Sequence, residues 1–198
     1  MSDSYTVFAG SQRIARGPIA FVAVAAQAWL GQGGEGVLVF DDETGRALDL
    51  DLRGTPAEAV SRLQDHPALR RPAPPVEEEA RHGRGRPKLG VVSREVSLLP
   101  RHWTWLADQP GGASAALRRL VEERMKASAG RDRARKAYDA AQRFAWAVAG
   151  NLPGFEEAMR ALGRHEHDRF TELVAPWPPD VRDHMVALVE AAREAERA

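Results

Sequence analysis

The chain has 198 residues, with 28 Lys and Arg, 28 Asp and Glu, and no Cys. This length suits one or two domains, and an apolar content of 43% is that of an ordinary globular protein rather than a disordered or fibrous one. Without Cys, the chain has no disulfide, iron–sulfur cluster, thiolate zinc site or thiol nucleophile. The formal net charge of zero does not exclude a polyanion partner, because charge has to be counted by region.

The charges are unevenly distributed along the chain. Residues 1–80 carry 7 basic and 12 acidic side chains, residues 81–143 carry 15 and 6, and residues 144–198 carry 6 and 10. The middle third therefore has a net charge of +9 between flanks of −5 and −4. Such a cationic segment is typical of proteins that bind polyanions. A solvated, Arg-rich helical surface would give the same count, so charge alone leaves both interpretations open.

Residues 1–64 are predicted to form a small α+β domain. Alternating residues in Tyr5–Ala9, the turn Gly10-Ser11 and the run Gln12–Ala15 indicate a hairpin. Pro18 then begins an apolar helix that ends near Leu30. This stretch is too short to cross a bilayer and has no clear small-residue cleavage site. We therefore expect a buried helix in a cytoplasmic protein that does not enter a membrane.

Two further strands and a short helix complete this domain. Val37–Phe40 is fully apolar and predicts a buried strand, whereas Ala47–Leu52 alternates strictly and predicts a half-exposed strand. Thr55 followed by Glu58 forms the sequence of a capping box, which predicts a helix that ends near Leu63. The expected order is β-β-α-β-β.

Residues 65–90 are predicted to be a flexible linker. The segment contains five prolines, which exclude a regular helix, and an acidic run at Glu77–Glu79. A basic run follows from Arg81. This composition is typical of a flexible, solvated segment.

The end of this linker contains the sequence Arg84-Gly85-Arg86-Pro87-Lys88. It resembles the core of an AT-hook. The resemblance implies an extended arm whose Arg side chains lie in a narrow minor groove, where A·T tracts concentrate negative potential. Short strings of this kind arise easily in an Arg-rich chain, so the motif has limited specificity on its own.

Residues 91–129 are predicted to form a strand, a short helix, a turn and a second helix. The strand covers Val91–Leu99, the first helix Arg101–Gln109 and the turn Pro110–Ala113, and Ser114 is placed at the N-cap of the second helix. This order resembles a ribbon-helix-helix DNA-binding unit. The resemblance implies a homodimer with an antiparallel ribbon in the major groove. It also implies that Gly112 and Ser114 lie near a phosphate.

The alternation of the predicted strand leaves its outward face undecided. The family pattern would bury Glu95, Ser97 and Leu99, whereas the opposite register gives a more apolar inward face but moves every side chain to the other side. Either the set Ser93, Glu95 and Ser97 or the residue Arg94 would then face DNA. A strand and two helices packed into a single globular core, with neither dimer nor DNA, is the alternative.

Residues 130–198 are predicted to form a helical domain. The helices are expected over Asp132–Gly150, Pro153–Leu162, His165–Val174 and Pro179–Arg197. His165 and His167 lie two residues apart, which on a helix directs them to different faces and does not favour a metal site. No nucleophile–base set or paired carboxylates stand out. We therefore expect no enzymatic activity and no cofactor.

Several stretches together resemble one bacterial family, domain of unknown function 2239. They are VLVFDDETGRALDLDLRG, GRPKLGVVSREVSLLPRHWTWL, GGASAALRRLVEE and NLPGFEEAMRAL. The resemblance extends over nearly the full length but implies no activity. The sequence thus predicts an α+β, dimeric DNA-binding protein, either a transcriptional regulator or a nucleoid-associated factor. The alternative is a non-enzymatic assembly module with a basic docking segment.

Overall fold

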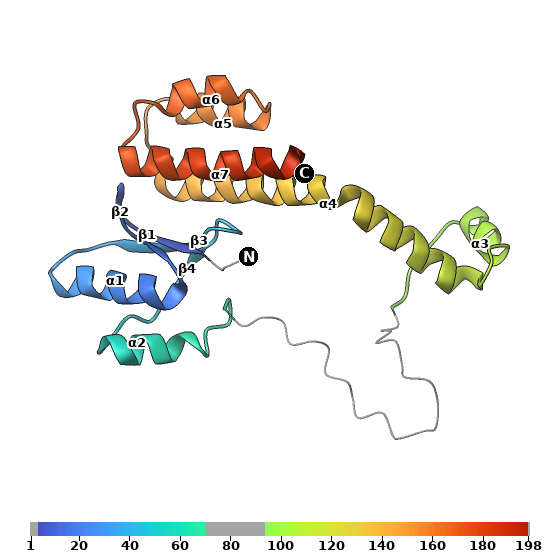
Figure 1. Ribbon diagram of the computed structural model, residues 1–198, viewed down its shortest axis with the longest axis horizontal. Helices are drawn as coiled ribbons and strands as arrows, with labels where there is room; N and C mark the ends of the chain where they lie inside the picture. Colours follow the sequence, from blue (N-terminus) through green and yellow to red (C-terminus); the bar gives the residue numbers. More distant parts are fainter. Residues whose placement is uncertain (1–3, 70–93, 198) are drawn as a thin grey trace. The chain divides into compact units, whose positions relative to one another are not determined.

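The computed structural model describes residues 4–69 and 94–197 (Figure 1). The chain divides into two compact units, which we call unit 1 (residues 1–70 and 130–198) and unit 2 (residues 71–129). Unit 1 contains a small antiparallel sheet and several helices, so the predicted α+β class is confirmed. No helix within the described residues is long and apolar enough to cross a membrane.

The sheet has four strands in the order β2-β1-β3-β4. These are β1 (Tyr5–Ala9), β2 (Gln12–Gly17), β3 (Val37–Asp41) and β4 (Ala47–Leu48), and every pair is antiparallel. The predicted hairpin of β1 and β2 is confirmed, with Gly10 at its turn in the left-handed region at φ +56°. Such a φ suits glycine because it lacks a Cβ.

Alternation along the strands gives the sheet two buried faces. Tyr5, Val7 and Val39 pack with Val22 and Ala26 of α1 (Ile19–Gly31), the apolar helix that the sequence predicted. Their neighbours along the chain, Phe8 and Phe40, belong to a second core on the opposite face. The period of two therefore places successive side chains in different layers.

Strand β4 is much shorter than the predicted strand Ala47–Leu52. It pairs with β3 at only two positions, Val39 with Leu48 and Phe40 with Ala47. Beyond Leu48, backbone carbonyl groups are bonded to side chains instead of to a strand. His66 Nε2 lies 2.9 Å from the Asp49 carbonyl oxygen, and Arg62 Nε donates to the Asp51 carbonyl oxygen at 3.2 Å. These bonds replace the ladder that the alternation predicted.

Helix α2 (Pro56–Leu63) begins with the predicted capping box. The Glu58 carboxylate accepts the Thr55 N–H at 2.8 Å, and the Thr55 hydroxyl accepts the Glu58 N–H at 3.4 Å. The two bonds satisfy backbone donors that a helix start leaves unpaired. This prediction is confirmed at the level of single atoms.

The second core of unit 1 is helical. Helix α4 (Gly112–Val148) contributes its C-terminal part, together with α5 (Phe155–Gly163), α6 (His167–Val174) and α7 (Pro179–Arg197). In Figure 1, α7 runs alongside the C-terminal part of α4. Phe144 of α4 lies 5.1 Å from the ring of Phe8 and 5.0 Å from that of Phe40. The N-terminal sheet and the C-terminal helices therefore share one core.

The described residues of unit 2 contain α3 (Pro100–Ala107) and the first part of α4. The sequence predicted separate helices after Ser114 and from Asp132, but α4 is one helix of 37 residues that continues through Gly130. A glycine inside a helix costs about 1 kcal/mol relative to alanine yet keeps its backbone N–H, so it weakens a helix without ending it.

Candidate functional site

Part of the predicted DNA-binding set lies outside the described residues. These are the five residues of the AT-hook-like sequence, Arg84, Gly85, Arg86, Pro87 and Lys88, together with Ser93. Their predicted roles remain sequence predictions. The other predicted residues, Arg94, Glu95, Ser97, Gly112 and Ser114, fall within unit 2.

The predicted strand does not form over its described part. Residues 94–99 are not in a strand, and Arg94, Glu95 and Ser97 are all exposed. A strand exists only when its N–H and C=O groups pair with a neighbour, and no described residue of this chain pairs with this segment. The inward and outward faces inferred from its alternation are therefore not defined here.

The start of α4 also differs from the prediction. Gly111 and Gly112 both have positive φ, +82° and +74°, and α4 begins at Gly112. The Gly112 N–H donates to the Gln109 carbonyl oxygen at 2.9 Å, which closes the turn after α3. Ser114 consequently lies inside the first turn of α4, so its predicted place at the N-cap is wrong.

The basic side chains in the first part of α4 are not held in ion pairs by described acidic residues. Arg118, Arg119, Arg124 and Lys126 of α4 form no ion pair with a described residue, and all four are exposed. Arginines of α5 to α7 differ in this respect. Arg160 lies 2.7 Å from Glu157, and Arg193 lies 2.7 Å from Glu190. These four cations of α4 thus remain available to an external anion.

Unit 2 also exposes much of its apolar surface. Within residues 94–129, the buried apolar residues are Leu106 and Ala116. The exposed large apolar residues of the same range are Val96, Leu99, Trp103, Trp105, Leu120, Val121 and Met125. Exposed tryptophans among other apolar side chains are typical of interaction surfaces.

A ring cluster in unit 1 was not foreseen from the sequence. The Tyr138 hydroxyl lies 2.7 Å from His167 Nε2 and donates to Glu196 Oε2 at 3.3 Å, while Glu196 Oε1 lies 3.3 Å from His165 Nδ1. Burial raises the pKa of Tyr138 to about 12 and lowers the pKa of His167. The cluster connects α4, α6 and α7 through side-chain hydrogen bonds.

His165 belongs to this cluster because it precedes α6 rather than forming part of it. Its φ is +57°, a left-handed conformation that non-glycine residues rarely adopt, and its ring centre lies 5.9 Å from that of His167. The prediction that the two rings diverge assumed that both lie on one helix, and the structure corrects it. The described residues nevertheless contain no group of His, Asp or Glu side chains arranged to hold a metal ion.

A second polar cluster lies between the sheet and α7. The Asp42 carboxylate accepts hydrogen bonds from the Ser4 hydroxyl at 2.9 Å, the Thr6 hydroxyl at 2.7 Å and Arg16 Nε at 2.9 Å. The imidazole of His184 is 1% exposed and packs against Phe144 at 4.5 Å. Burial lowers the pKa of His184 to about 4, so this ring is neutral at pH 7.

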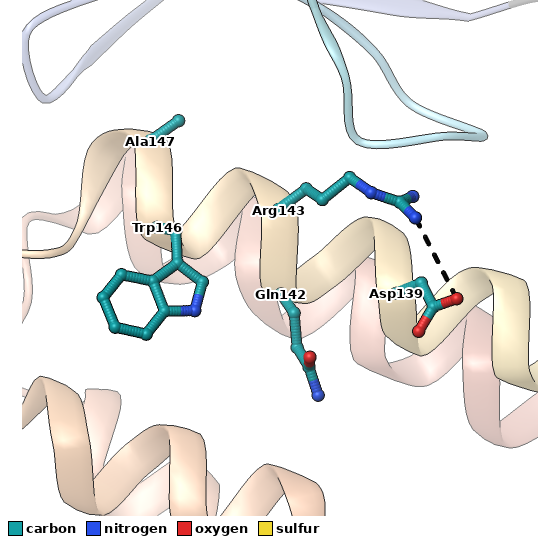
Figure 2. A pocket seen from close by; sticks show the side chains of 5 residues that line it. All are labelled: Asp139, Gln142, Arg143, Trp146 and Ala147. Atoms are coloured by element: carbon teal, nitrogen blue, oxygen red, sulfur yellow. Dashed lines mark ion pairs between the residues drawn. The ribbon is translucent and has the colours of Figure 1, made fainter.

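An open surface along α4 carries a prominent aromatic side chain. Figure 2 shows Gln142 and Trp146 on the same side of the helix, with Arg143 directed elsewhere and 4.0 Å from Asp139. Trp146 is 68% exposed and makes an edge contact with Phe155 at 4.8 Å. The surface is too flat to enclose a ligand.

Comparison with family models gives a match over residues 4–189 to a family described as "Uncharacterized protein conserved in bacteria (DUF2239)". The chain belongs to this family. The match includes Asp42, Tyr138 and His184 but ends before Glu196. No curated protein and no solved structure matches the chain. Membership in DUF2239 thus agrees with the resemblance seen in the sequence.

Proposed function

We propose that this DUF2239 protein binds DNA as a dimer, through the basic segment that includes the first part of α4. The observation that carries the proposal is that Arg118, Arg119, Arg124 and Lys126 have no acidic partners among the described residues, in the region of the chain with a net charge of +9. Cations that are not already paired release counterions from DNA when they meet phosphates, which is the main source of affinity in such complexes.

Position on the helix supports a contiguous phosphate-binding stripe within unit 2. Arg118, Arg119 and Lys126 fall within an arc of about 100° at 100° per residue, with Glu122 between them. A rigid helix keeps such side chains in a fixed row, so several of them can meet successive phosphates at once. The negative charge of Glu122 reduces the positive electrostatic potential of this row but does not cancel it.

The AT-hook-like sequence adds a second element to the proposal. Arg84 and Arg86 are assigned to the minor groove by their sequence alone, since they lie outside the described residues. The predicted ribbon would pair residues 91–99 of two chains, so it remains a sequence prediction, and we propose it as the contact of the dimer. The proposal therefore assigns phosphate contacts to α4 and groove contacts to the arm.

A DNA-binding role also sets the expected location and chemistry. We propose that the protein is cytoplasmic, where bacterial DNA lies, and that it acts as a regulator or nucleoid-associated factor without enzymatic activity. Neither polar cluster of unit 1 is assigned a catalytic step.

Fluorescence anisotropy of labelled A·T-rich and G·C-rich duplexes tests the proposal. We expect affinity to fall steeply between about 50 and 200 mM salt, as it does when several phosphates are contacted. The double variant Arg118→Ala/Arg119→Ala should bind both duplexes more weakly and reduce the salt slope by about 1 to 2. The variant Arg84→Ala/Arg86→Ala should lose preference for the A·T-rich duplex.

The matched control is Arg160→Ala/Arg169→Ala, which removes two arginines that already have acidic partners in α5 and α6. This variant should bind DNA like the wild type. The proposal is wrong if no salt-dependent binding occurs, or if the α4 and arm variants both bind as tightly as the control.

A second candidate function is protein–protein assembly, and the exposed apolar residues of unit 2 favour it. A segment that buries so few apolar side chains lacks the core of a free-standing fold, so a partner surface would stabilise it. Sedimentation of the wild type and of Trp105→Ser/Val121→Ser tests this. An oligomer that the variant dissociates, in a protein that fails to bind duplex DNA, would favour assembly over DNA binding.

A further inference from the structure

A groove in unit 1 lies where the end of β3 approaches α4 and α7. Its volume is about 350 Å³, which is within the range of small-molecule sites. Its lining includes Asp41, Asp42, Glu43, Arg133, Lys136 and Leu188. Its lining includes neither the ring cluster of Tyr138, His165 and His167 nor the α4 cations Arg118 and Arg119.

The acidic wall of the groove is held in place by α4. Arg143 Nη1 donates to the Thr44 carbonyl oxygen at 2.7 Å. Gly45, at φ +65°, approaches α4 so closely that a Cβ there would lie 2.1 Å from the Ala140 carbonyl oxygen. The turn after β3 therefore rests directly on the helix backbone, and the carboxylates that it carries have a fixed position.

The basic wall is formed by the same face of α4. Lys136 and Arg133 precede Ala140 by four and seven residues, a spacing that places all three on one side of the helix. A helix rises about 1.5 Å per residue, so the backbone of Lys136 lies about 6 Å, and that of Arg133 about 10 Å, along the axis from the point where the turn touches α4. Both side chains are exposed, and neither has an ion-pair partner among the described residues.

Two carboxylates on the acidic wall remain free for a ligand. Asp42 is occupied by its bonds to the sheet, whereas Asp41 uses only Oδ1, which accepts the N–H groups of Glu43 at 2.8 Å and Thr44 at 3.0 Å. The Glu43 carboxylate has no partner among the described residues. Free charges of opposite sign thus face the groove from two different elements.

Between the charged walls the lining is apolar. It consists of the buried Leu188 and the small residues Ala137, Ala191 and Ala195. A ligand with a single charge would meet one wall of like charge, whereas a zwitterion with separated charges satisfies both. We propose that the groove binds a short zwitterion of dipeptide size, with its carboxylate toward Arg133 and Lys136 and its ammonium toward Asp41 and Glu43.

Isothermal titration of the full chain with L-alanyl-L-leucine tests this proposal. We expect a dissociation constant in the millimolar range or below, and at least a tenfold weakening for the N-acetylated and the C-amidated dipeptide. Arg133→Ala and Glu43→Gln should each weaken binding to a similar degree. Arg131→Ala is the matched control, because Arg131 is exposed on α4 but does not line the groove, and it should leave the affinity unchanged.

Circular dichroism of each variant verifies that these surface substitutions leave the fold intact. The proposal is overturned if the free dipeptide gives no heat of binding, or if Arg133→Ala binds as well as Arg131→Ala. Equal binding of the N-acetylated and free dipeptides would also overturn it, since the site would then recognise an anion alone. The outcome can be told apart from that of the DNA test, because that test uses Arg118→Ala/Arg119→Ala and neither residue lines the groove.

Discussion

His184 Nε2 of α7 lies 3.8 Å from Asp42 Oδ1 at the end of β3, with both side chains almost entirely shielded from water. The same carboxylate accepts hydrogen bonds from Ser4, Thr6 and Arg16. The buried Asp42 carboxylate therefore accepts hydrogen bonds from β1 and β2 and also faces α7. In the low dielectric of a protein interior, a change in the charge of one such group alters its interaction energy with the others strongly.

Acid should destabilise the fold through His184. Its pKa is lowered from 6.5 to about 4 by burial between Phe8 and Phe144, beside Arg13 and Arg16, although Asp42 opposes this shift. The unfolded chain therefore binds a proton more readily, and the stability that the neutral ring provides is lost as the pH falls from 6.5 toward 4. We expect a loss of about 3 kcal/mol over this window in urea unfolding, because one pKa unit is worth about 1.4 kcal/mol.

The variant His184→Gln should lose this part of the pH dependence, since glutamine does not titrate. His102→Gln provides the control, because His102 is exposed on α3 and should leave the profile unchanged. A His184→Gln protein that still loses the same stability between pH 6.5 and 4 would show that other groups cause the acid sensitivity.

Removing the Tyr138 hydroxyl should weaken the contact between α4, α6 and α7. Tyr138→Phe keeps the ring but removes the group that meets His167 and Glu196. We expect a loss of about 1 to 2 kcal/mol in the free energy of unfolding, because His167 Nε2 is left without its partner. A double-mutant cycle with His167→Gln should give a coupling energy of about 1 kcal/mol, and additive single effects would contradict the bond.

Two glycines with similar backbone angles should respond very differently to alanine. A Cβ added at Gly10, where φ is +56°, would have no atom within 4 Å, whereas a Cβ at Gly45 would meet the Ala140 backbone. Gly10→Ala should cost about 1 to 2 kcal/mol from the left-handed conformation alone. Gly45→Ala should cost more than about 3 kcal/mol, because α4 has to move as well. Thermal unfolding of both proteins measures the difference, and equal melting temperatures would contradict it.

The capping box of α2 should contribute measurably to stability. Thr55→Ala removes the hydroxyl that accepts the Glu58 N–H, and we expect a loss of about 1 kcal/mol in the free energy of unfolding. Ser61→Ala serves as the control, because Ser61 is exposed within the same helix and alanine is a good helix former there. Similar losses for both variants would mean that the cap bonds contribute little.

Features set by neighbouring residues were predictable from the sequence. The cap at Thr55, the hairpin around Gly10 and the bounds of α7 all follow from interactions within a few residues, and each is confirmed. The alternation of Val39 and Phe40 between two layers likewise follows from strand geometry.

Features that depend on distant partners were not predictable. The alternation of residues 47–52 indicated a strand, but side chains from α2 and beyond take its carbonyl groups. The meeting of His165 with His167 depends on a single left-handed residue before α6, and the groove depends on how the β3 turn rests on α4. No local pattern in the sequence encodes these contacts, because they arise only when separated segments pack together.

Unit 1 combines two segments that are far apart in the sequence, and this has a consequence for folding during synthesis. Phe8 and Phe40 are covered by residues of α4 and α7, which the ribosome makes about a hundred residues later or more. At about 5 to 20 residues per second, the sheet waits on the order of ten seconds with these rings uncovered. The N-terminal segment expressed alone should therefore be prone to aggregate, and nascent chains that stall before α7 should depend on chaperones.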